Sequence, residues 1–248
     1  MLAVARHIRP ATVVISATKG LDIETGRRMT QVICEEAPGL RGAQVGALSG
    51  PNLAPEIAAG KIASATVAFV EPKTATMAQD ALNSEVFRVY RSDDVAGVEL
   101  GGALKNVIAI GAGIIDGSAF GDNAKAAYVT RGLQEITRLG IALGAQSETF
   151  AGLSGMGDLV ATCYSGLSRN RRVGQEIAAG ASLPDILTRL NQVAEGVPTT
   201  RAAIKLAKEH RVEMPITEMT GRVLFEGLSP AKAVEALMRR VPQPEVRY

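Results

Sequence analysis

Short apolar runs and amphipathic segments alternate along the first 90 residues, and this alternation constrains the fold more than any other feature of the sequence. Runs rich in apolar and β-branched residues predict strands at 11–17, 44–48, 65–70 and 87–90. Helical spacing and turn residues predict helices at 25–36, 53–60 and 74–83. Alternation of this kind is typical of a parallel sheet with helices packed on it.

The remainder of the chain lacks strand signals. From Asp93 to a proline-rich tail near Pro242, segments rich in glycine, alanine and leucine predict helices only. A long helix is expected to start near Asp94, where the adjacent acidic residues complement the helix dipole. We therefore expect two domains, an α/β domain at residues 1–91 and an all-α domain at residues 92–248.

Composition excludes several classes of function. The 27 basic and 25 acidic residues are interspersed, so no one-signed face for nucleic acid is expected. Aromatic residues make up only 4% of the chain, too few to build stacking platforms for single strands. The N-terminus lacks the apolar stretch of a signal peptide, and the most apolar segment, 107–115, is far shorter than the roughly 20 residues of a membrane helix. A small-molecule function is favoured.

Cysteine and histidine are scarce. The only cysteines, Cys34 and Cys163, lie far apart in unrelated contexts, which fits reduced thiols in a cytosolic protein. The only histidines, His7 and His210, leave no material for a Cys/His zinc site or a histidine-based nucleophile. Any acid or base must therefore be a lysine or a carboxylate.

The predicted helix at residues 98–115 carries Lys105 and Asn106 within a surface of glycine, alanine and branched aliphatic residues. Gly101 and Gly102 each cost a helix roughly 1 kcal/mol relative to alanine, so we expect a backbone or a ligand to approach closely there. A lysine on an amphipathic helix ordinarily keeps its ammonium in water. In a desolvated pocket its pKa falls toward roughly 7–8, where it serves as an acid or base. Lys105 is thus a candidate acid–base group.

A second polar cluster contains Asp158, Thr162 and the run Ser-Arg-Asn-Arg-Arg at 168–172. Guanidinium groups bind phosphate bidentately, and amide and hydroxyl groups fill the remaining oxygens, so the run favours a phosphorylated ligand. The alternative is a solvated basic helix start that Ser168 caps. Asp158, in a glycine-rich turn, either caps a helix or orients a lysine ammonium from another element.

A third group follows the predicted strands. Lys19 comes after the first strand, and the turn Ser-Gly-Pro-Asn at 49–52 comes after the second. Ligands of open parallel sheets bind beyond the carboxyl ends of the strands, which favours an anionic ligand here, although either feature alone would indicate an ordinary loop. No strand-turn-helix with G-x-G-x-x-G occurs, and Gly-Ala-Gly at 111–113 has the wrong spacing. The residues thus indicate phosphate chemistry without the dinucleotide fingerprint.

Seven ordered segments carry a resemblance to a known family. They are SATKG at 16–20, LSGPN at 48–52, VELGGALKN at 98–106, GDNAKAA at 121–127, GMGDLVATC at 155–163, SGLSRNRR at 165–172 and MPIT at 214–217. Together they resemble the NAD(P)-dependent glycerol-3-phosphate dehydrogenases of bacteria across nearly the whole chain. The resemblance implies an incomplete Rossmann-type parallel sheet domain, followed by a helical domain like that of 6-phosphogluconate dehydrogenase.

The resemblance also implies a function. The expected reaction is the reduction of dihydroxyacetone phosphate to sn-glycerol 3-phosphate by NADH or NADPH, in the cytoplasm, for glycerophospholipid synthesis. The expected partner is a phosphorylated triose, with neither nucleic acid nor membrane insertion, and a homodimer is compatible with the family.

Individual residues acquire roles from the same resemblance. Lys105 is expected to exchange the proton at the carbonyl oxygen, with Asp158 orienting it and no metal. The implied substrate-binding residues are Lys19, Gly50, Asn52, Lys105, Asp158, Thr162, Ser168, Arg169 and Asn170. The implied cofactor contacts are Lys19, Ala54, Arg169, Val193 and Glu195. Asn52 departs from the family pattern, which usually has serine or threonine at this position.

The resemblance places the start of the chain inside the Rossmann domain. Two or three βα units of roughly 30 residues each, including the glycine fingerprint, are expected to be missing. Without them the chain should bind cofactor poorly and expose an unfinished sheet. The choice between NADH and NADPH would lie in those units.

Two alternatives remain open. One is a related dehydrogenase that acts on a β-hydroxyacid, against which the adjacent Lys105 and Asn106 and the arginine run argue. The other is an inactive remnant that binds phosphorylated ligands.

Overall fold

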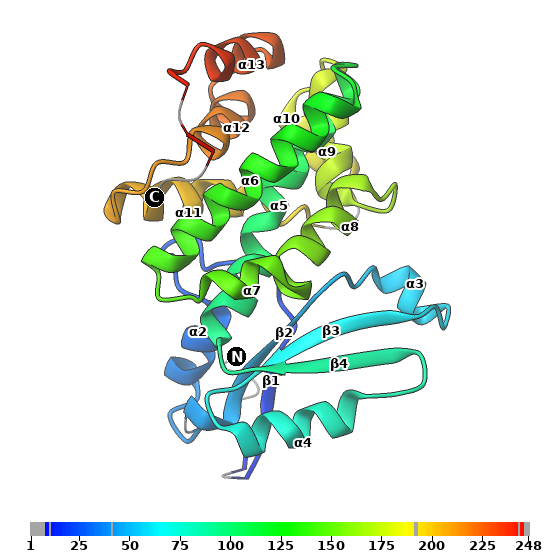
Figure 1. Ribbon diagram of the computed structural model, residues 1–248, viewed down its shortest axis with the longest axis vertical. Helices are drawn as coiled ribbons and strands as arrows, with labels where there is room; N and C mark the ends of the chain where they lie inside the picture. The colour runs from blue at the N-terminus through cyan, green and yellow to red at the C-terminus, as the bar shows by residue number, and fades with distance from the viewer. Residues whose placement is uncertain (1–7, 10, 41, 191–192, 243, 246–248) are drawn as a thin grey trace.

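The computed structural model describes all of the 248 residues except 1–7, 10, 41, 191–192, 243 and 246–248. His7 and most of the N-terminal segment therefore lie outside the described residues. Figure 1 shows two regions, a sheet with its helices and a larger group of helices. The predicted order of α/β followed by all-α is confirmed, because β4 is the last strand and only helices follow it in the described part of the chain.

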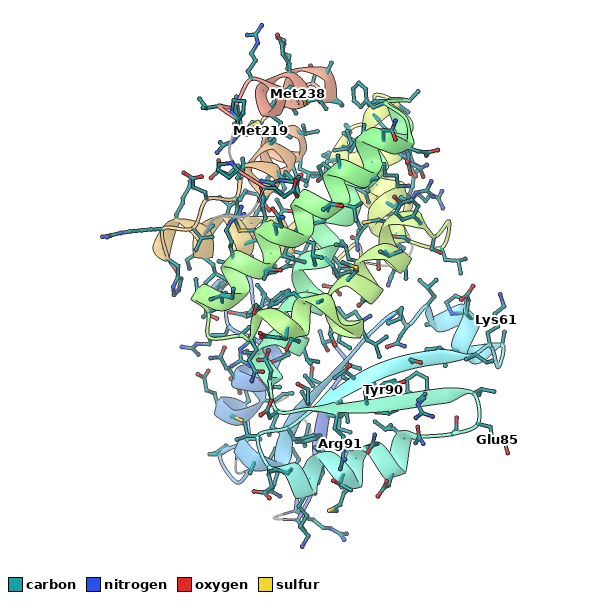
Figure 2. All side chains as sticks on the ribbon, viewed as in Figure 1. Lys61, Glu85, Tyr90, Arg91, Met219 and Met238 are labelled. Carbon is teal, nitrogen blue, oxygen red and sulfur yellow. The ribbon has the colours of Figure 1, made fainter. Side chains whose placement is uncertain are left out.

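Four strands form the sheet in the order β1-β2-β3-β4. They are β1 (Val14–Ser16), β2 (Val45–Ser49), β3 (Ala63–Ala68) and β4 (Phe87–Ser92). The helical elements of this region are α2 (Met29–Glu36), η1 (Gly42–Gln44), α3 (Ala54–Ala58) and α4 (Pro72–Leu82). Figure 2 shows Lys61 and Glu85 at the turns of the sheet that point away from the helical region.

The prediction of a fully parallel sheet is wrong for one pairing. β1 with β2 and β3 with β4 are parallel, whereas β2 and β3 are antiparallel with Ser49 opposite Thr66. A parallel crossover needs a dozen or more residues and usually a full helix to return the chain along the sheet. The connection at residues 50–62 contains only the five-residue α3, so the chain turns back beside β2 instead.

The first predicted helix begins later than expected. The sequence predicts it from residue 25, but α2 begins at Met29. Gly26 adopts a φ of +74°, which no right-handed helix allows. The backbone N–H of Arg28 then donates to Gln31 Oε1 at 2.9 Å, which closes the start of the helix.

In the described part of the chain, ten further helical elements follow the sheet. They are α5 (Val95–Gly117), α6 (Asp122–Ala142), α7 (Ser147–Ala151), the π-helical turn η2 (Leu153–Gly157), α8 (Asp158–Tyr164), α9 (Arg169–Ala178), α10 (Leu183–Arg189), α11 (Gly196–Glu209), α12 (Pro215–Phe225) and α13 (Pro230–Met238). The domain boundary after residue 91 remains a prediction, with β4 ending one residue later.

Helix α5 is the core of the molecule. Asp94 caps it by accepting from the backbone N–H of Gly97 at 2.8 Å. α6, α8, α9 and α11 surround it (Figure 1). By length and composition α5 could cross a membrane, but its most apolar window is completely buried inside the protein. It is therefore a core helix, as the sequence predicts for residues 107–115.

A buried carboxylate fixes the start of α12, within the MPIT segment. Glu135 on α6 accepts the backbone N–H groups of Ile216 at 2.7 Å and Thr217 at 3.0 Å. Burial raises the pKa of Glu135 to about 7, against the lowering effect of these hydrogen bonds. The conformation of this segment thus depends on a side chain 81 positions earlier in the chain.

Glycines let α5 and its neighbours approach backbone to backbone. A Cβ on Gly101 would lie 2.6 Å from the carbonyl oxygen of Ser154, and one on Gly102 would lie 2.4 Å from Ser49 Oγ. The predicted close approach of a backbone is confirmed at Gly101, whereas Gly102 faces the side chain of Ser49. On α9, a Cβ on Gly174 would lie 1.9 Å from the carbonyl oxygen of Ile110.

Replacing Gly174 with alanine is therefore expected to force α9 away from α5. We predict that Gly174→Ala lowers the free energy of unfolding by roughly 1–3 kcal/mol, the usual cost of overpacking, measured by urea denaturation. Gly39→Ala is the control, because nothing lies within 4 Å of its added Cβ. If Gly174→Ala and Gly39→Ala had the same free energy of unfolding, the close contact between Gly174 and Ile110 would be contradicted.

Candidate active site

The structure brings Lys105, Asp158 and Thr162 together. Lys105 is only 5% exposed and lies in the middle of α5. Its Nζ lies 2.7 Å from Asp158 Oδ1 and donates to Thr162 Oγ1 at 2.5 Å. Asp158 is the first residue of α8 and Thr162 lies one turn later, so both face the same way.

Lys19 approaches the same carboxylate from the loop after β1. Its Nζ lies 2.6 Å from Asp158 Oδ2 and donates to the carbonyl oxygen of Gly50 at 2.8 Å. Each carboxylate oxygen of Asp158 thus accepts a hydrogen bond from a different ammonium group. Gly50 has a φ of +151°, and a Cβ there would lie 2.8 Å from the carbonyl oxygen of Ser64, so only glycine fits this turn.

Burial changes the acidity of Lys105. Desolvation is the largest effect and lowers its pKa, the carboxylate of Asp158 raises it, and the charge of Lys19 lowers it, so that the pKa of Lys105 is about 8 in all. Lys105 is therefore largely protonated at neutral pH and close to its titration point. An ammonium has three N–H donors, and the contacts above use two on each lysine. One N–H of each remains to meet an oxygen of a ligand.

Asn106 stands out beside Lys105 in the sequence, but no role in the site was predicted for it. It is 4% exposed, and its Nδ2 donates to the carbonyl oxygen of Lys19 at 3.2 Å. Its Oδ1 accepts from Asn170 Nδ2 at 2.9 Å, and Asn170 Oδ1 accepts the backbone N–H of Gly196 at 2.9 Å. These bonds connect the Lys19 loop, α5, α9 and α11. The sequence feature that could have identified Asn106 as a site residue is an amide side chain within an otherwise apolar helix.

The arginine run is less uniform than the sequence suggests. Ser168 caps α9 by accepting the backbone N–H of Arg171 at 3.2 Å. Arg171 and Arg172 form ion pairs with Asp116 and Glu176, at 2.6 and 3.0 Å respectively. Both arginines are thus paired with carboxylates, and binding of phosphate by the run remains a prediction. Arg169 is exposed at the start of the helix.

The remaining predicted contacts lie around this centre. Glu195 sits at the start of α11, with Oε2 3.1 Å from the position of a Cβ on Gly20, next to Lys19. Asn52 Nδ2 donates to the carbonyl oxygen of Ser64 at 3.0 Å, in the turn after β2. Ala54 and Val193 are exposed, and their roles remain predictions.

Neither a disulfide nor a metal-binding cluster is found in the described part of the chain. Cys34 and Cys163 are free thiols, and burial raises the pKa of Cys163 to about 12. In the part of the chain that the structure describes, no three His, Cys, Asp or Glu residues are arranged to hold a metal ion.

A Rossmann-type region followed by helices, with a buried lysine held by an aspartate between them, defines a class of two-domain dehydrogenases. Two family models match the chain, the NAD-dependent glycerol-3-phosphate dehydrogenase N-terminus over residues 2–75 and C-terminus over residues 94–235. The chain belongs to this family of NAD(P)-dependent oxidoreductases.

Known relatives agree with the family models. The chain is 48% identical over 250 residues to a glycerol-3-phosphate dehydrogenase (NAD(P)+) of Thermobifida fusca, covering 100% of this chain and 73% of the relative. It is 53% identical to that of Pelotomaculum thermopropionicum, covering 92% and 65%. The crystal structure of a glycerol-3-phosphate dehydrogenase from Coxiella burnetii superposes with a TM-score of 0.90 and 37% identity, covering 96% of this chain and 72% of that one.

The paired ammonium groups generate a prediction. Lys19→Met should raise the pKa of Lys105 above about 8, because the variant removes a neighbouring positive charge. The pKa is measured by NMR titration of isotope-labelled lysine side chains. Lys61→Met is the control, since Lys61 is an exposed lysine on the outer side of the sheet (Figure 2). An unchanged or lower pKa in Lys19→Met would show that Lys19 does not act on Lys105.

Proposed function

We propose that this chain catalyses the exchange of hydride between NADH or NADPH and dihydroxyacetone phosphate, giving sn-glycerol 3-phosphate. The observation that carries the proposal is the buried Lys105, with a pKa of about 8, between Asp158 and Thr162. The relatives named above support this reaction over a β-hydroxyacid dehydrogenase and over an inactive remnant. The product is the backbone unit of glycerophospholipids.

Lys105 supplies the proton for this reaction. In the reducing direction its ammonium donates a proton to the carbonyl oxygen as hydride reaches the carbonyl carbon, which leaves Lys105 neutral and the substrate as an alcohol. In the oxidising direction the neutral amine removes the same proton. Asp158 and Thr162 hold Nζ in place, so the remaining N–H points at the reacting oxygen.

The start of α9 supplies the contacts to the substrate phosphate. Arg169 offers a guanidinium for bidentate contact, and the Ser168 hydroxyl and the second N–H of the Asn170 amide complete the donor set. Lys19, with Gly50 and Asn52 in the adjacent turn, binds the hydroxyl end of the triose. This division places the phosphate on the helical side and the carbonyl between the two lysines.

The loop after β1, with Lys19, would contribute to holding the cofactor. The fit is indicated by the buried Gly20, where an added Cβ would press on the Glu195 carboxylate, beside a lysine that carries one uncommitted N–H. A bound nicotinamide supplies the hydride. Lys19 and Ala54 from residues 1–91, and Arg169, Val193 and Glu195 from residues 92–248, would hold the cofactor.

The setting of the reaction completes the proposal. The protein works in the cytoplasm on a small phosphorylated triose, without nucleic acid or membrane insertion, and assembles as a homodimer. The burial of α5 supports the absence of membrane insertion, and the interspersed charges support the absence of a nucleic-acid partner. The homodimer rests on the family resemblance alone.

The test is oxidation of NADH and NADPH by the purified chain with dihydroxyacetone phosphate. We expect any oxidation to depend on the phosphorylated substrate, and not on unphosphorylated dihydroxyacetone or the carbonyl form of a β-hydroxyacid, and to need a high cofactor concentration because the chain is expected to bind cofactor poorly. Lys105→Met should lower kcat by roughly 10²–10⁴-fold, the usual contribution of a general acid. Calorimetric binding of sn-glycerol 3-phosphate gives a readout that needs no cofactor. A chain that neither binds this ligand nor turns over its substrate would refute the proposal.

The same assay across pH tests the direction of proton transfer. Reduction needs the ammonium, so its rate should fall as pH rises through about 8, whereas oxidation of glycerol 3-phosphate needs the amine and should rise over the same range. Two profiles of the same sign would show that Lys105 is not the acid–base group.

A further inference from the structure

A charged cluster outside the active site involves Asp116, Lys125, Arg171 and Tyr164, which we name the Asp116 cluster. Asp116 Oδ2 lies 2.8 Å from Lys125 Nζ and 2.6 Å from Arg171 Nε. Lys125 Nζ also lies 4.3 Å from the centre of the Tyr164 ring. One carboxylate therefore holds two cations, and one of these also contacts an aromatic face.

The burial of Lys125 is unusual for a side chain with no part in the proposed reaction. Its side chain is only 5% exposed, and those of Asp116 and Arg171 are 18% and 19% exposed. Buried ion pairs gain little stability relative to well-packed apolar residues, because both charges lose their hydration. Fixing a geometry is a better-supported use of such a group than adding stability.

The cluster lies at both ends of the segment that binds phosphate in the proposed function. Tyr164 is the last residue of α8, and Arg171 lies in the first turn of α9. Between them are residues 165–170, which include Ser168, Arg169 and Asn170. The other two members of the cluster come from different helices, with Asp116 in the last turn of α5 and Lys125 in the first turn of α6.

Backbone packing makes the same connection. A Cβ on Gly113 would lie 1.9 Å from the carbonyl oxygen of Arg171, so α5 and the start of α9 touch directly. Because α5 also carries Lys105, the acid–base group and the phosphate-binding segment are both fixed against the same helix. A shift of Arg171 relative to Asp116 would move the phosphate contacts relative to the reacting oxygen.

We propose that Asp116 and Lys125 are positioning residues that hold residues 165–170 in the geometry for binding a phosphate monoester. This inference rests on the proposed function. Lys125 does not touch the ligand, because its ammonium is enclosed by Asp116 and Tyr164, and Arg171 is committed to the same carboxylate. Asp116 and Lys125 act through the backbone of the segment that carries Arg169.

The test compares Lys125→Met with wild type and with Lys125→Arg. Methionine keeps much of the apolar stem and removes the charge. We expect the Kd for sn-glycerol 3-phosphate, measured by calorimetry, to rise roughly tenfold in Lys125→Met, equivalent to ~1.4 kcal/mol. The KM for dihydroxyacetone phosphate should rise with it, while kcat stays within about twofold. Lys125→Arg should restore most of the affinity, and Asp116→Asn should behave like Lys125→Met.

A matched control separates positioning from general destabilisation. Arg28→Met breaks another partly buried ion pair, between Arg28 and Glu99 at 2.7 Å, which also holds an element to α5. It lies at the opposite end of α5 and should leave the Kd for glycerol 3-phosphate unchanged. Thermal unfolding of all variants shows that they fold.

The outcomes distinguish this inference from the proposed function. Failure of the folded wild type to bind or turn over its ligand refutes the function and, with it, the positioning role. Tight binding by wild type and by Lys125→Met alike overturns the positioning role alone. Equal weakening in Arg28→Met and Lys125→Met also overturns it, because the effect would then be general.

Discussion

The proposed chemistry depends on one carboxylate placed between two ammonium groups. Asp158 gives Oδ1 to Lys105 and Oδ2 to Lys19, and it is 2% exposed. Without this charge two buried or half-buried cations would face each other, and desolvation would favour the neutral amine of Lys105. With it, Lys105 keeps a proton at neutral pH but gives it up readily. The carboxylate also joins the sheet region to the helical region, since Lys19 follows β1 and Asp158 begins α8.

Helix α5 provides the frame on which this arrangement is built. Its glycines admit the backbones of η2, which directly precedes Asp158, and of α9, which begins at Arg169, so both are fixed against the helix that carries Lys105. The two ends of the helix are held by polar contacts, with Asp94 as the cap at one end and the Asp116 cluster at the other. A helix that reads as a membrane span by composition is thus a rigid scaffold for a polar site.

Local patterns predicted the elements better than their pairing. The strands near residues 14, 45, 63 and 87 follow from β-branched runs, but the antiparallel pairing of β2 with β3 depends on how the short α3 connection folds back. Lys105 was a candidate because an isolated lysine in an apolar helix is unusual. Its partner lies 53 positions away, and Asn106 meets Asn170 across 64 positions. Such contacts arise from tertiary packing, which periodicity does not encode, and the ion pair of Arg171 with Asp116, 55 positions earlier, was missed for the same reason. The pair of Arg172 with Glu176 is a local contact within α9.

The central claim is that Asp158 holds Lys105 in a protonated but readily titrated state. It is tested most directly by the pKa of Lys105 in Asp158→Asn, measured by NMR titration of labelled lysine side chains. The amide keeps the shape of the side chain and removes its charge, so the pKa of Lys105 should fall below the value of about 8 in the wild type. A pKa that is unchanged or higher would contradict the account, because the carboxylate would then not be what keeps the proton on Lys105.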